Sequence, residues 1–498
     1  MDSKMRLGLE VLVISLLNGL TADLLLRELP WGANIFLWVA GFGGSLLFLS
    51  YRWRQEKIPF DHGLVLMAVV FSAAGAWRDS PTLRGLNLMV TAIAVGLLAR
   101  PQLLLHLRRA GVIEYFLNLI LAWLSPMIGP TFVFSSEMEW KQIPRSKWTS
   151  QASAIVRGAI IAFPLLLVFG GLLVSADATF ERIVNHFFNF DPAELIVHAG
   201  LTLVVAWLTG GLIQRMFLDN GPGLAPSTLL PLGLRNLGIT EVATVLSLLN
   251  LLFLSFVLIQ IRYFFGGAAR VFTTSGLTFA EYARRGFFEL VTVAALVLPV
   301  LLALHWMLNQ ENPAHERLFR WLAGFQIVML LVMMTSALQR MMMYQKMYGL
   351  TELRVYTTAF MLWLAVVFVW FGMTVLRGQR QAFAFGALMM AIIAIGTLNV
   401  INPDALIAGT NLARVSEGRT VDAVYLTRLS ADAVPVVVNH LETIHLSQRV
   451  RVADWLITRW TPDEKITWRS WNLSRSKAWQ KVYDRQTELC ALACQPVE

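Results

Sequence analysis

"TEVATVLSLLNLLFLSFVLIQIRYFFGG", residues 240–267, is an apolar stretch long enough to cross a lipid bilayer. The hydrocarbon core of a bilayer is about 30 Å thick, and an α-helix needs about 20 mostly apolar residues to span it. The stretch has no charged residue between Glu241 and Arg262. It therefore predicts a transmembrane helix, and similar stretches recur along the first four hundred positions.

The composition of the whole chain agrees with an integral membrane protein. The 498 residues are 56% hydrophobic and 15% charged, with a mean hydropathy of +0.59, which lies outside the range of soluble proteins. The net charge of +9 comes from basic residues scattered through short connections between apolar runs. Lys and Arg at such positions fix topology and attract anionic lipid headgroups. We therefore expect membrane lipids as partners, and no nucleic acid.

About twelve apolar runs predict an all-α, polytopic bundle over residues 1–401. The third and fourth runs are short. The fifth contains Pro126 and Pro130, which a helix tolerates only where neighbours satisfy the freed backbone groups. The expected spans are residues 7–26, 31–50, 63–77, 85–99, 113–134, 152–174, 195–217, 240–261, 286–308, 318–338, 355–376 and 382–401.

The basic residues of the first connections predict a cytoplasmic N-terminus. One face carries Lys4, Arg6, Arg52, Arg54, Lys57, Arg100, Arg108 and Arg109, and the other carries Arg27, Arg78 and Arg84. The side of the C-terminal part depends on residues 113–134. It is cytoplasmic if this run crosses the membrane and outside if it does not. We expect twelve crossings and a cytoplasmic tail.

Residues 402–498 form a polar tail with helical spacing of apolar residues. Within it, "ITWRSWNLSRSKAWQKVYDRQ" (466–486) combines Trp with Lys and Arg, which is typical of a helix lying on lipid headgroups. A small helical subdomain with a basic face is the alternative, and a protein partner is expected to act through this tail. Cys490 and Cys494 have no companion ligands at metal spacing. We therefore predict no metal site and no cofactor.

Polar residues inside the spans give two further predictions. In the first span, Asp23 and Arg27 are four residues apart, as in an ion pair along one helix. In the eighth, Asn250 belongs to a polar stripe that ends near Gln260 and Arg262. Such a stripe either lines a water-filled path or holds neighbouring helices together, and the sequence leaves both alternatives open.

The stretch "GLTFAEYARRGFFEL" (276–290) carries a cluster of charges directly before an apolar run. Thr278 and Glu281 have the spacing of a capping box, so a helix is expected to begin there. Glu281, Arg285 and Glu289 then share one helical face, on which the central Arg bridges two carboxylates. Arg284 lies off this ladder and is free to meet an anionic headgroup or substrate.

A second stretch, "YGLTELRVYTTAFM" (348–361), resembles the first and places Arg354 after the same Gly-Leu-Thr. The separation of 73 residues is about one pair of spans. Two interpretations remain, a two-span repeat covering 240–308 and 318–376, or a helix start that is used twice. The candidate binding residues are accordingly Glu281, Arg284, Arg285, Glu289, Arg354, Asn250, Gln260 and Arg262.

Several of these phrases, together with "NPDALIAGTNLAR" (402–414) and "WRSWNLSRSKA" (468–478), resemble a known family. They are similar to bacterial multi-spanning membrane proteins catalogued as domain of unknown function 4173. The resemblance covers roughly residues 150 to 480. It implies a bacterial cytoplasmic-membrane location and no particular activity.

Three classes of function remain open. A transporter or lipid-handling permease is the leading hypothesis, because of the number of spans and the polar stripe. A regulatory or scaffolding protein that acts through its tail is the second. A membrane-embedded enzyme at the lipid interface is the third, although the chain contains no HExxH, Walker or GxSxG motif and its eight His residues are dispersed.

Overall fold

The structure is a computed structural model, and nine ranges of the chain are described in it. These ranges contain α-helices and short 3-10 helices as their regular elements, which confirms the all-α class. The described residues are 3–53, 60–132, 192–217, 238–265, 287–308, 313–415, 417–419, 421–461 and 467–493.

Within these ranges, nine helices are long and apolar enough to cross a membrane, and two more are apolar but shorter. These eleven coincide with eleven of the expected spans, whereas the expected span 152–174 lies outside the described residues. The chain is thus a multi-pass helical protein. The helices are α1 (Ser3–Leu26), α2 (Ala33–Arg52), α3 (His62–Trp77), α4 (Pro81–Leu98), α6 (Val112–Phe132), α9 (Pro192–Phe217), α11 (Ile239–Phe265), α14 (Phe287–Met307), α15 (Pro313–Tyr348), α16 (Glu352–Thr374) and α17 (Phe383–Ile401).

Local sequence signals set several of these boundaries. Asp61 precedes α3, and its carboxylate accepts a hydrogen bond from the Gly63 amide at 2.8 Å, as an N-cap residue does. α4 starts at Pro81, where a missing amide hydrogen costs nothing. Asn402 directly follows the last residue of α17 and adopts a left-handed conformation with φ 58°. The same residue is the N-cap of the next helix.

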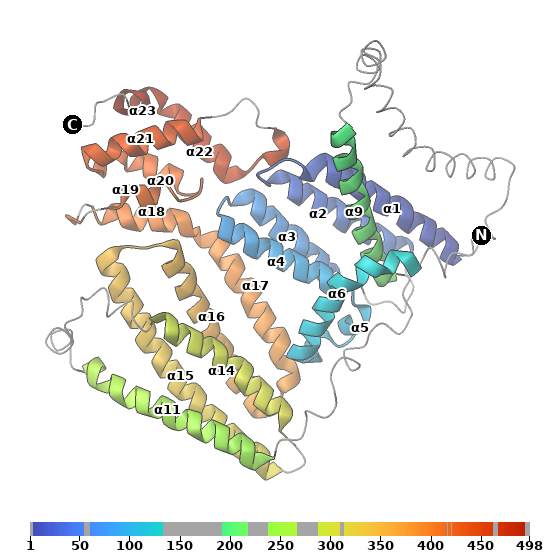
Figure 1. Ribbon diagram of the computed structural model, residues 1–498, viewed down its shortest axis with the longest axis vertical. Helices are drawn as coiled ribbons and strands as arrows, with labels where there is room; N and C mark the ends of the chain where they lie inside the picture. Colours follow the sequence, from blue (N-terminus) through green and yellow to red (C-terminus); the bar gives the residue numbers. More distant parts are fainter. Residues whose placement is uncertain are drawn as a thin grey trace, which may run out of the picture.

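The apolar helices form two lobes with separate cores (Figure 1). α1, α2, α3, α4, α6 and α9 make the first lobe, and α11, α14, α15 and α16 make the second. α17 packs against both, because Phe383 is buried in the second core and the adjacent Ala384 in the first. Further along α17, Ile395 packs with Phe71 and Val90 of the first lobe. α17 therefore joins the two lobes.

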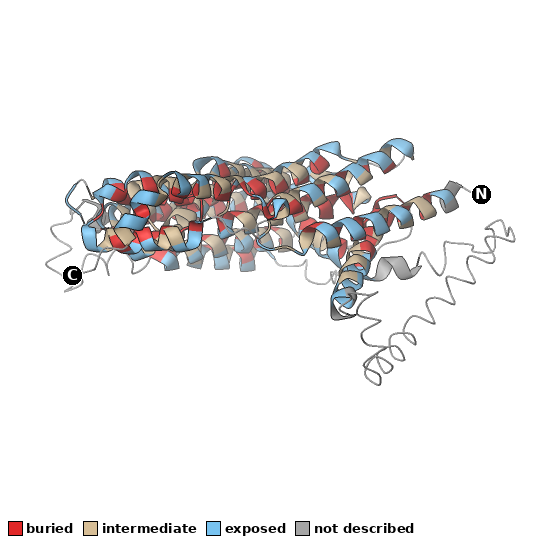
Figure 2. Cartoon of the chain, turned by 90° about the horizontal axis from the view of Figure 1, so that it is seen from above, coloured by how far each residue is buried: buried red, intermediate tan, exposed pale blue. Residues whose placement is uncertain are grey.

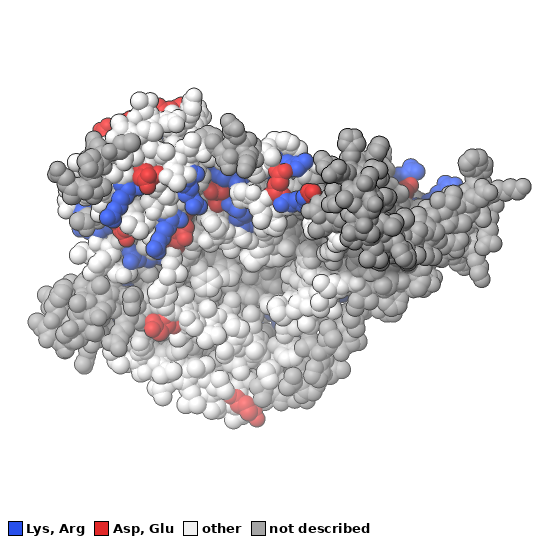
Figure 3. Space-filling model, turned by 45° about the horizontal axis from the view of Figure 1, so that its top comes forward, with Lys and Arg blue, Asp and Glu red and all other residues white. Residues whose placement is uncertain are grey.

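The outward-facing surface of the lobes is suited to lipid. Exposed positions lie along the outside of the helices (Figure 2), and many of them are large hydrophobic residues such as Leu248, Leu251 and Trp321. On the face seen in Figure 3, charged side chains of the described residues gather at the tail and its margin, and few lie over the helices below. Contiguous apolar surface of this kind is expected where a helix bundle meets the bilayer.

The start of α1 and the tail lie at opposite ends of the bundle. Glu28, directly after α1, is 2.6 Å from the guanidinium of Arg469 in the tail, so α1 ends beside the tail. Its start lies at the other end of the bundle (Figure 1). We call the end where α1 begins the first face, and the end that carries the tail the second face. The start of α1 and the tail thus lie at opposite ends of the bundle, and the expectation that both are cytoplasmic stays a prediction.

The fifth apolar run bears on the side of the tail. α6 begins at the first face, where Asn118 accepts a hydrogen bond from Arg100 at 2.8 Å. At Met127 it has reached only the middle of α9, because the Met127 carbonyl accepts a hydrogen bond from Trp207. Residues up to Met127 thus run along about half of α9. Whether the run 113–134 crosses a membrane, and with it the side of the tail, stays a prediction.

Charged residues near the second face link α1 to α9. Asp23 Oδ2 lies 2.6 Å from His198 Nδ1, and Arg27 Nη2 lies 3.2 Å from Glu194 Oε1. The expected pair between Asp23 and Arg27 does not form. Each of the two groups pairs with a residue of α9 instead, and these pairs link the two helices.

The tail is a compact helical unit with its own hydrophobic core. Val434, Val437, Ala453 and Leu456 are all fully buried in that core. The alternative of a small helical subdomain is therefore the one that fits the arrangement. Its helices are α18 (Pro403–Ala413), α19 (Ala423–Leu426), α20 (Val434–Asn439), α21 (Leu446–Trp460), α22 (Leu473–Asp484) and α23 (Gln486–Ala493).

Candidate functional site

The tail meets the second face of the bundle in a buried polar cluster, which we call the junction. The turn between α3 and α4 supplies the bundle side. Three segments of the tail supply the other side, and two of them belong to the phrases "NPDALIAGTNLAR" and "WRSWNLSRSKA". The junction consists of Arg78, Asp79, Ser80, Asp404, Ser430, Asp432, Asn472, Ser474 and Arg475.

Asp432 lies at the centre of the junction and its side chain is fully buried. One carboxylate oxygen accepts hydrogen bonds from the amides of Asp79 and Ser80, at 2.7 and 3.1 Å. The other accepts from the Ser474 hydroxyl at 2.6 Å and faces the guanidinium of Arg78 at 3.3 Å. A buried carboxylate with this many donors is well satisfied. Asp432 therefore ties the α3–α4 turn to two parts of the tail.

Arg78 also reaches the end of α17. Its Nε donates to the Asn399 carbonyl at 2.7 Å. The Asn399 side chain exchanges two hydrogen bonds with that of Asn87 on α4, at 2.9 and 2.8 Å, and both side chains are buried. The first lobe, α17 and the tail consequently meet at one point.

Asp79 forms the second charged centre of the junction. Its Oδ1 lies 2.8 Å from Arg84 Nη2 and 3.4 Å from Arg475 Nε. Burial raises the pKa of the Asp79 carboxyl group above its ordinary value, although Arg475 and Arg84 act to lower it. The same burial lowers the pKa of Arg475.

The start of α22 is held by its own cap and by the bundle. The Asn472 side-chain oxygen accepts from the Arg475 amide, and its nitrogen donates to the carbonyls of Gly75 and Arg78. The Ser474 hydroxyl contacts the Trp77 carbonyl at 2.9 Å. An N-cap Asn whose amide also satisfies the end of another helix leaves neither helix terminus unpaired. This segment is therefore held between the tail and the bundle, and its contact with lipid headgroups stays a prediction.

Asp404, at the start of α18, is the acidic residue of the junction that lacks a basic partner among the described residues. Its side chain is buried, and Oδ2 accepts from the Ser430 hydroxyl at 2.5 Å and from the Ser430 amide at 3.2 Å. Oδ1 is buried with no donor among the described residues. Burial raises the pKa of Asp404 above its ordinary value.

A second cluster lies at the first face, between the two lobes. A cavity of about 480 Å³ is lined there by Arg108 and Arg109 of the first lobe and by Arg380 just before α17. His305 and Glu316 of the second lobe complete the lining, together with residues 378–382. Glu316 pairs with Arg320 at 2.6 Å, whereas the three arginines have no carboxylate partner among the described residues. We call this the arginine cavity.

Comparison with protein families gives one assignment. A family model described as Domain of unknown function (DUF4153) matches residues 64–440. The chain belongs to this family. The family expected from the resemblance, domain of unknown function 4173, is therefore not the one that matches, although both are families without an assigned function. Comparisons with curated proteins and with solved structures give no match.

The match to the DUF4153 family includes the three arginines of the arginine cavity and part of the junction. It covers the α3–α4 turn, Asp404 and Asp432 of the junction, and the three arginines of the cavity. It ends before the segment that contains Asn472 and Arg475. The bundle side of the junction thus lies within the family domain, and part of the tail side lies beyond it.

Arg354 is placed where its charge serves a helix end. Its guanidinium donates to the carbonyls of Gly349 and Tyr348, at 2.5 and 3.3 Å, and lies 4.1 Å from the centre of the Tyr344 ring. Arg414 and Arg419 of the tail donate to the adjacent carbonyls of Met347 and Lys346. Three cations thus converge on the C-terminus of α15, where they interact favourably with the helix dipole. These contacts explain the position of Arg354 without a bound ligand.

Gly349 makes this arrangement possible. It has φ +76°, a left-handed conformation, and a Cβ there would lie 2.3 Å from the side-chain oxygen of Asn411. Asn411 bonds both the amide and the carbonyl of Leu350. The second Gly-Leu-Thr is thus a turn that ends α15 and docks on the tail, and α16 begins directly after Thr351.

The polar stripe of the eighth span is mostly used for helix contacts. Asn250 is buried and donates to the Leu322 carbonyl of α15 at 3.0 Å. Thr244 and Ser255 bond carbonyls of their own helix. Gln260 is buried, and the side chain of Arg262 lies outside the described residues. Among the two alternatives, these contacts favour helix packing.

The charge cluster of the first Gly-Leu-Thr stretch lies almost wholly outside the described residues. This applies to Thr278, Glu281, Arg284 and Arg285, so their assignment as a capping box and ladder stays a prediction. Glu289 is exposed in the first turn of α14. The two-span repeat also stays a prediction, although its four helices all lie in the second lobe.

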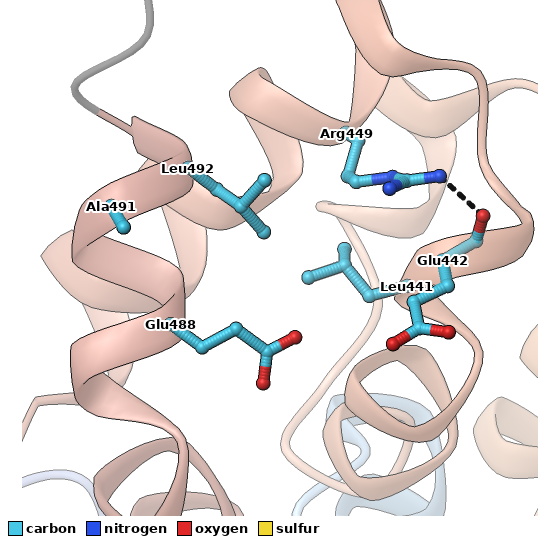
Figure 4. A pocket seen from close by; sticks show the side chains of 6 residues that line it. All are labelled: Leu441, Glu442, Arg449, Glu488, Ala491 and Leu492. Atoms are coloured by element: carbon cyan, nitrogen blue, oxygen red, sulfur yellow. Dashed lines mark hydrogen bonds between the residues drawn. The ribbon is translucent and has the colours of Figure 1, made fainter.

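The tail contains a cavity of about 550 Å³ (Figure 4). Leu441 and Leu492 line it, and Glu442, Glu488 and Arg449 lie at its edge. Arg449 donates to the backbone carbonyls of Glu442 and Ile444, so its charge is used to hold the 442–444 turn. Cys490 is an exposed free thiol on α23, and Cys494 lies outside the described residues.

Neither cluster has a direct signal in the sequence. In the sequence pattern, Arg78, Arg108 and Arg109 indicate only topology, and Asp404, Asp432 and Arg380 belong to no motif. The indirect signal is that a tail with its own core must rest on the bundle, where the polar turns at the helix ends are the available contacts.

Proposed function

We propose that this protein is a permease that binds an anionic amphiphile, with a phosphate-bearing headgroup held in the arginine cavity. The observation that carries the proposal is the convergence of three arginines. Arg108 and Arg109 come from the first lobe, and Arg380 lies just before α17, the helix that joins the two lobes. Arginine binds phosphate through two parallel hydrogen bonds. A cavity of about 480 Å³ lies within the usual range for small-ligand sites.

The two-lobe architecture supports transport over static binding. Many permeases move one helix bundle against another around a site between them. Here the ligand would contact both lobes, so its binding would depend on how the lobes are placed. α17 passes between the lobes, with polar clusters near both of its ends.

Reconstitution tests the proposal. The full chain is incorporated in vesicles that contain a fluorescently labelled anionic phospholipid, and movement of the label between leaflets is followed by quenching from outside. We expect accelerated movement, reduced at least tenfold in Arg108→Gln and Arg380→Gln. Arg317→Gln is the matched control, because Arg317 is exposed near the start of α15 and does not line the cavity. Equal rates in protein-free vesicles, or equal loss in the control, would reject the permease.

We also propose that the first face is cytoplasmic and that the tail lies outside a bacterial inner membrane. Basic residues at helix ends favour the cytoplasmic side. At the second face, the short connections and the helix ends beside them carry Arg27, Arg78, Arg84, Lys346 and Arg354. At the first face lie Arg6, Arg52, Arg100, Arg108, Arg109, Arg377 and Arg380.

The native thiol of Cys490 makes the orientation measurable. A membrane-impermeant maleimide should label it in intact spheroplasts. Arg109→Cys, placed in a Cys490→Ser and Cys494→Ser background, should react only after permeabilisation. The reverse pattern would place the tail in the cytoplasm.

A regulatory role through the tail is the second candidate function, and the junction is the observation that favours it. The tail has its own core and is bound to the bundle through buried charged residues. A change in the conformation of the bundle would therefore alter the position of the tail. Deletion of residues 405–498 should then abolish the cellular phenotype while lipid movement in vesicles persists. Loss of both would instead make the tail part of the permease. The third class, an interfacial enzyme, rests on the charge cluster outside the described residues and gains no support here.

A further inference from the structure

The length of α1 places the turn between α1 and α2 at the edge of the bilayer. The apolar part of this helix, Arg6–Leu26, has 21 residues, and a helix of that length rises about 31 Å. The hydrocarbon core of a bilayer is about 30 Å thick. The exposed residues Leu17, Leu20 and Leu24 share one side of α1 and carry its lipid-facing surface to the end of the helix. The 27–32 turn is therefore expected at the level of the lipid headgroups.

A segment of the tail lies beside this turn. It contains the 3-10 helix η8 (Trp468–Ser470). The Arg469 guanidinium is 2.6 Å from the Glu28 carboxylate. The Ala33 amide donates to the Trp471 carbonyl at 2.7 Å. These two contacts fix η8 and the residue after it at the depth of the α1–α2 turn.

Large apolar side chains of both segments are exposed. Leu29 is 73% exposed, Trp468 is 61% exposed and Trp471 is 43% exposed. By contrast, Trp479 in the following helix packs against the hydrophobic core of the tail. Exposed tryptophan rings at the level of the headgroups are typical of the aromatic belts of membrane proteins. We call Leu29, Trp468 and Trp471 the tryptophan patch.

The two arginines that bind the α1–α2 turn are paired with carboxylates. Arg469 pairs with Glu28. Arg475 donates to the Trp31 carbonyl at 3.0 Å, and its Nε lies 3.4 Å from Asp79 Oδ1. An anionic headgroup would have to compete with a carboxylate for either arginine. An indole ring, in contrast, has an apolar body and a polar N–H, so it is suited to the boundary between headgroups and acyl chains whatever the charge of the lipid.

We infer that the tryptophan patch anchors the tail in the headgroup region of the leaflet at the second face, through its rings and not through its charges. The inference is independent of the permease and of the side of the membrane on which the second face lies. The sequence predicts a helix on the headgroups within 466–486, whereas this anchor is confined to two turns. The helix that follows, α22, begins inside the junction, where Asn472 and Ser474 bond carbonyls of the bundle.

Depth-dependent quenching of a fluorescent probe tests the anchor. The full chain with Trp468→Cys, Cys490→Ser and Cys494→Ser carries a thiol-linked fluorophore and is placed in phosphatidylcholine nanodiscs. The lipid is spin-labelled either at the headgroup or near the end of the acyl chain. We expect the probe at 468 to lose more than half of its fluorescence with the headgroup label and to change little with the deep label.

The native thiol of Cys490 provides the matched control. Cys490 is exposed on α23, which lies on the far side of the tail from the bundle (Figure 1). The same fluorophore on Cys490, in a Cys494→Ser background, should be quenched by neither lipid. Equal quenching at 468 and 490 would overturn the inference. If Trp468→Cys does not fold, Leu29→Cys carries the same test, because Leu29 is exposed in the same patch.

The lipid composition distinguishes rings from charges. Replacing part of the phosphatidylcholine by phosphatidylglycerol should leave the quenching at 468 unchanged. Quenching that appears only with the anionic lipid would assign the contact to the arginines and overturn the inference.

Hydrogen exchange shows whether the rings hold the tail in place. Trp468 is mostly exposed, so its replacement removes little contact with the protein itself. In nanodiscs, peptides covering 467–473 should exchange several-fold faster in Trp468→Ser than in the wild type. Trp468→Tyr keeps a ring suited to the interface and should exchange like the wild type. Equal exchange in the wild type and in Trp468→Ser would show that the patch does not anchor the tail.

Discussion

Asn87 of α4 and Asn399 of α17 exchange two side-chain amide hydrogen bonds inside the bundle, at 2.9 and 2.8 Å. The pair joins helices that are 312 residues apart in the chain. Both side chains are almost completely buried, so neither has water as a substitute partner. Next to this pair, Arg78 bonds the Asn399 carbonyl and carries the connection into the tail.

Replacing one asparagine of this pair should destabilise the protein more than replacing both. Asn87→Leu leaves the Asn399 amide without its partner, which costs about 1 to 2 kcal/mol. The double variant Asn87→Leu and Asn399→Leu removes both polar groups and should recover part of that loss. A double-mutant cycle on the free energy of unfolding, measured in mixed micelles, checks this. Strict additivity would show that the two amides do not interact.

Asp432→Asn should have one of the largest effects of any single change in the tail. It leaves Arg78 buried without a countercharge, and breaking a buried ion pair costs about 3 kcal/mol or more. Asp484→Asn is the control, since Asp484 is exposed at the end of α22. Limited proteolysis should cut the tail from the Asp432 variant much faster than from the control. Similar cleavage in the two variants would contradict a structural role for the junction.

Gly32→Ala should weaken the contact between the α1–α2 turn and α22. A Cβ at this position would lie 2.2 Å from the Trp471 carbonyl oxygen, and the backbone must shift to relieve the clash. We expect a loss of about 2 kcal/mol, typical of overpacking. Gly44→Ala in α2 has nothing within 4 Å and should stabilise its helix by about 0.5 to 1 kcal/mol. Thermal unfolding of both variants gives the comparison, and equal shifts would show that the turn adjusts freely.

The stability of the junction should fall as pH rises, partly through Asp79. Burial raises the pKa of Asp79 in the folded state, so the folded protein binds this proton more tightly than the unfolded chain. The associated stabilisation is fully present below the ordinary pKa and is lost as pH rises through the raised one. Asp79→Asn should flatten this dependence in denaturation curves recorded at several pH values. A slope as steep as that of the wild type would assign the dependence to other groups.

The span boundaries were predictable because the length of an apolar run is set by bilayer thickness, a local property of the sequence. Eleven helices could be placed this way, and the short third run is short in the structure as well. The sidedness of the tail could not be predicted, because it depended on a single Pro-containing run. The partner of Asp23 could not be predicted either. Its nearest charge in sequence is Arg27, but its partner His198 is 175 residues away.

The candidate sites were harder to predict than the helices. Arg354 has the composition of an anion-binding residue, yet its charge is used by carbonyls at the end of α15. Asp404 gives no signal in the sequence, because its hydrogen-bond partner Ser430 lies 26 positions away and meets it only when the tail folds.

Arg78 is synthesised long before the residues that it binds. Its partners Asn399 and Asp432 enter the chain 321 and 354 residues later. At about 5 to 20 residues per second, the α3–α4 turn remains without these partners for tens of seconds. During that time a half-made first lobe sits in the bilayer with an unpaired cation at its edge. A chain truncated before Asp432 would leave Arg78 without its carboxylate partner permanently.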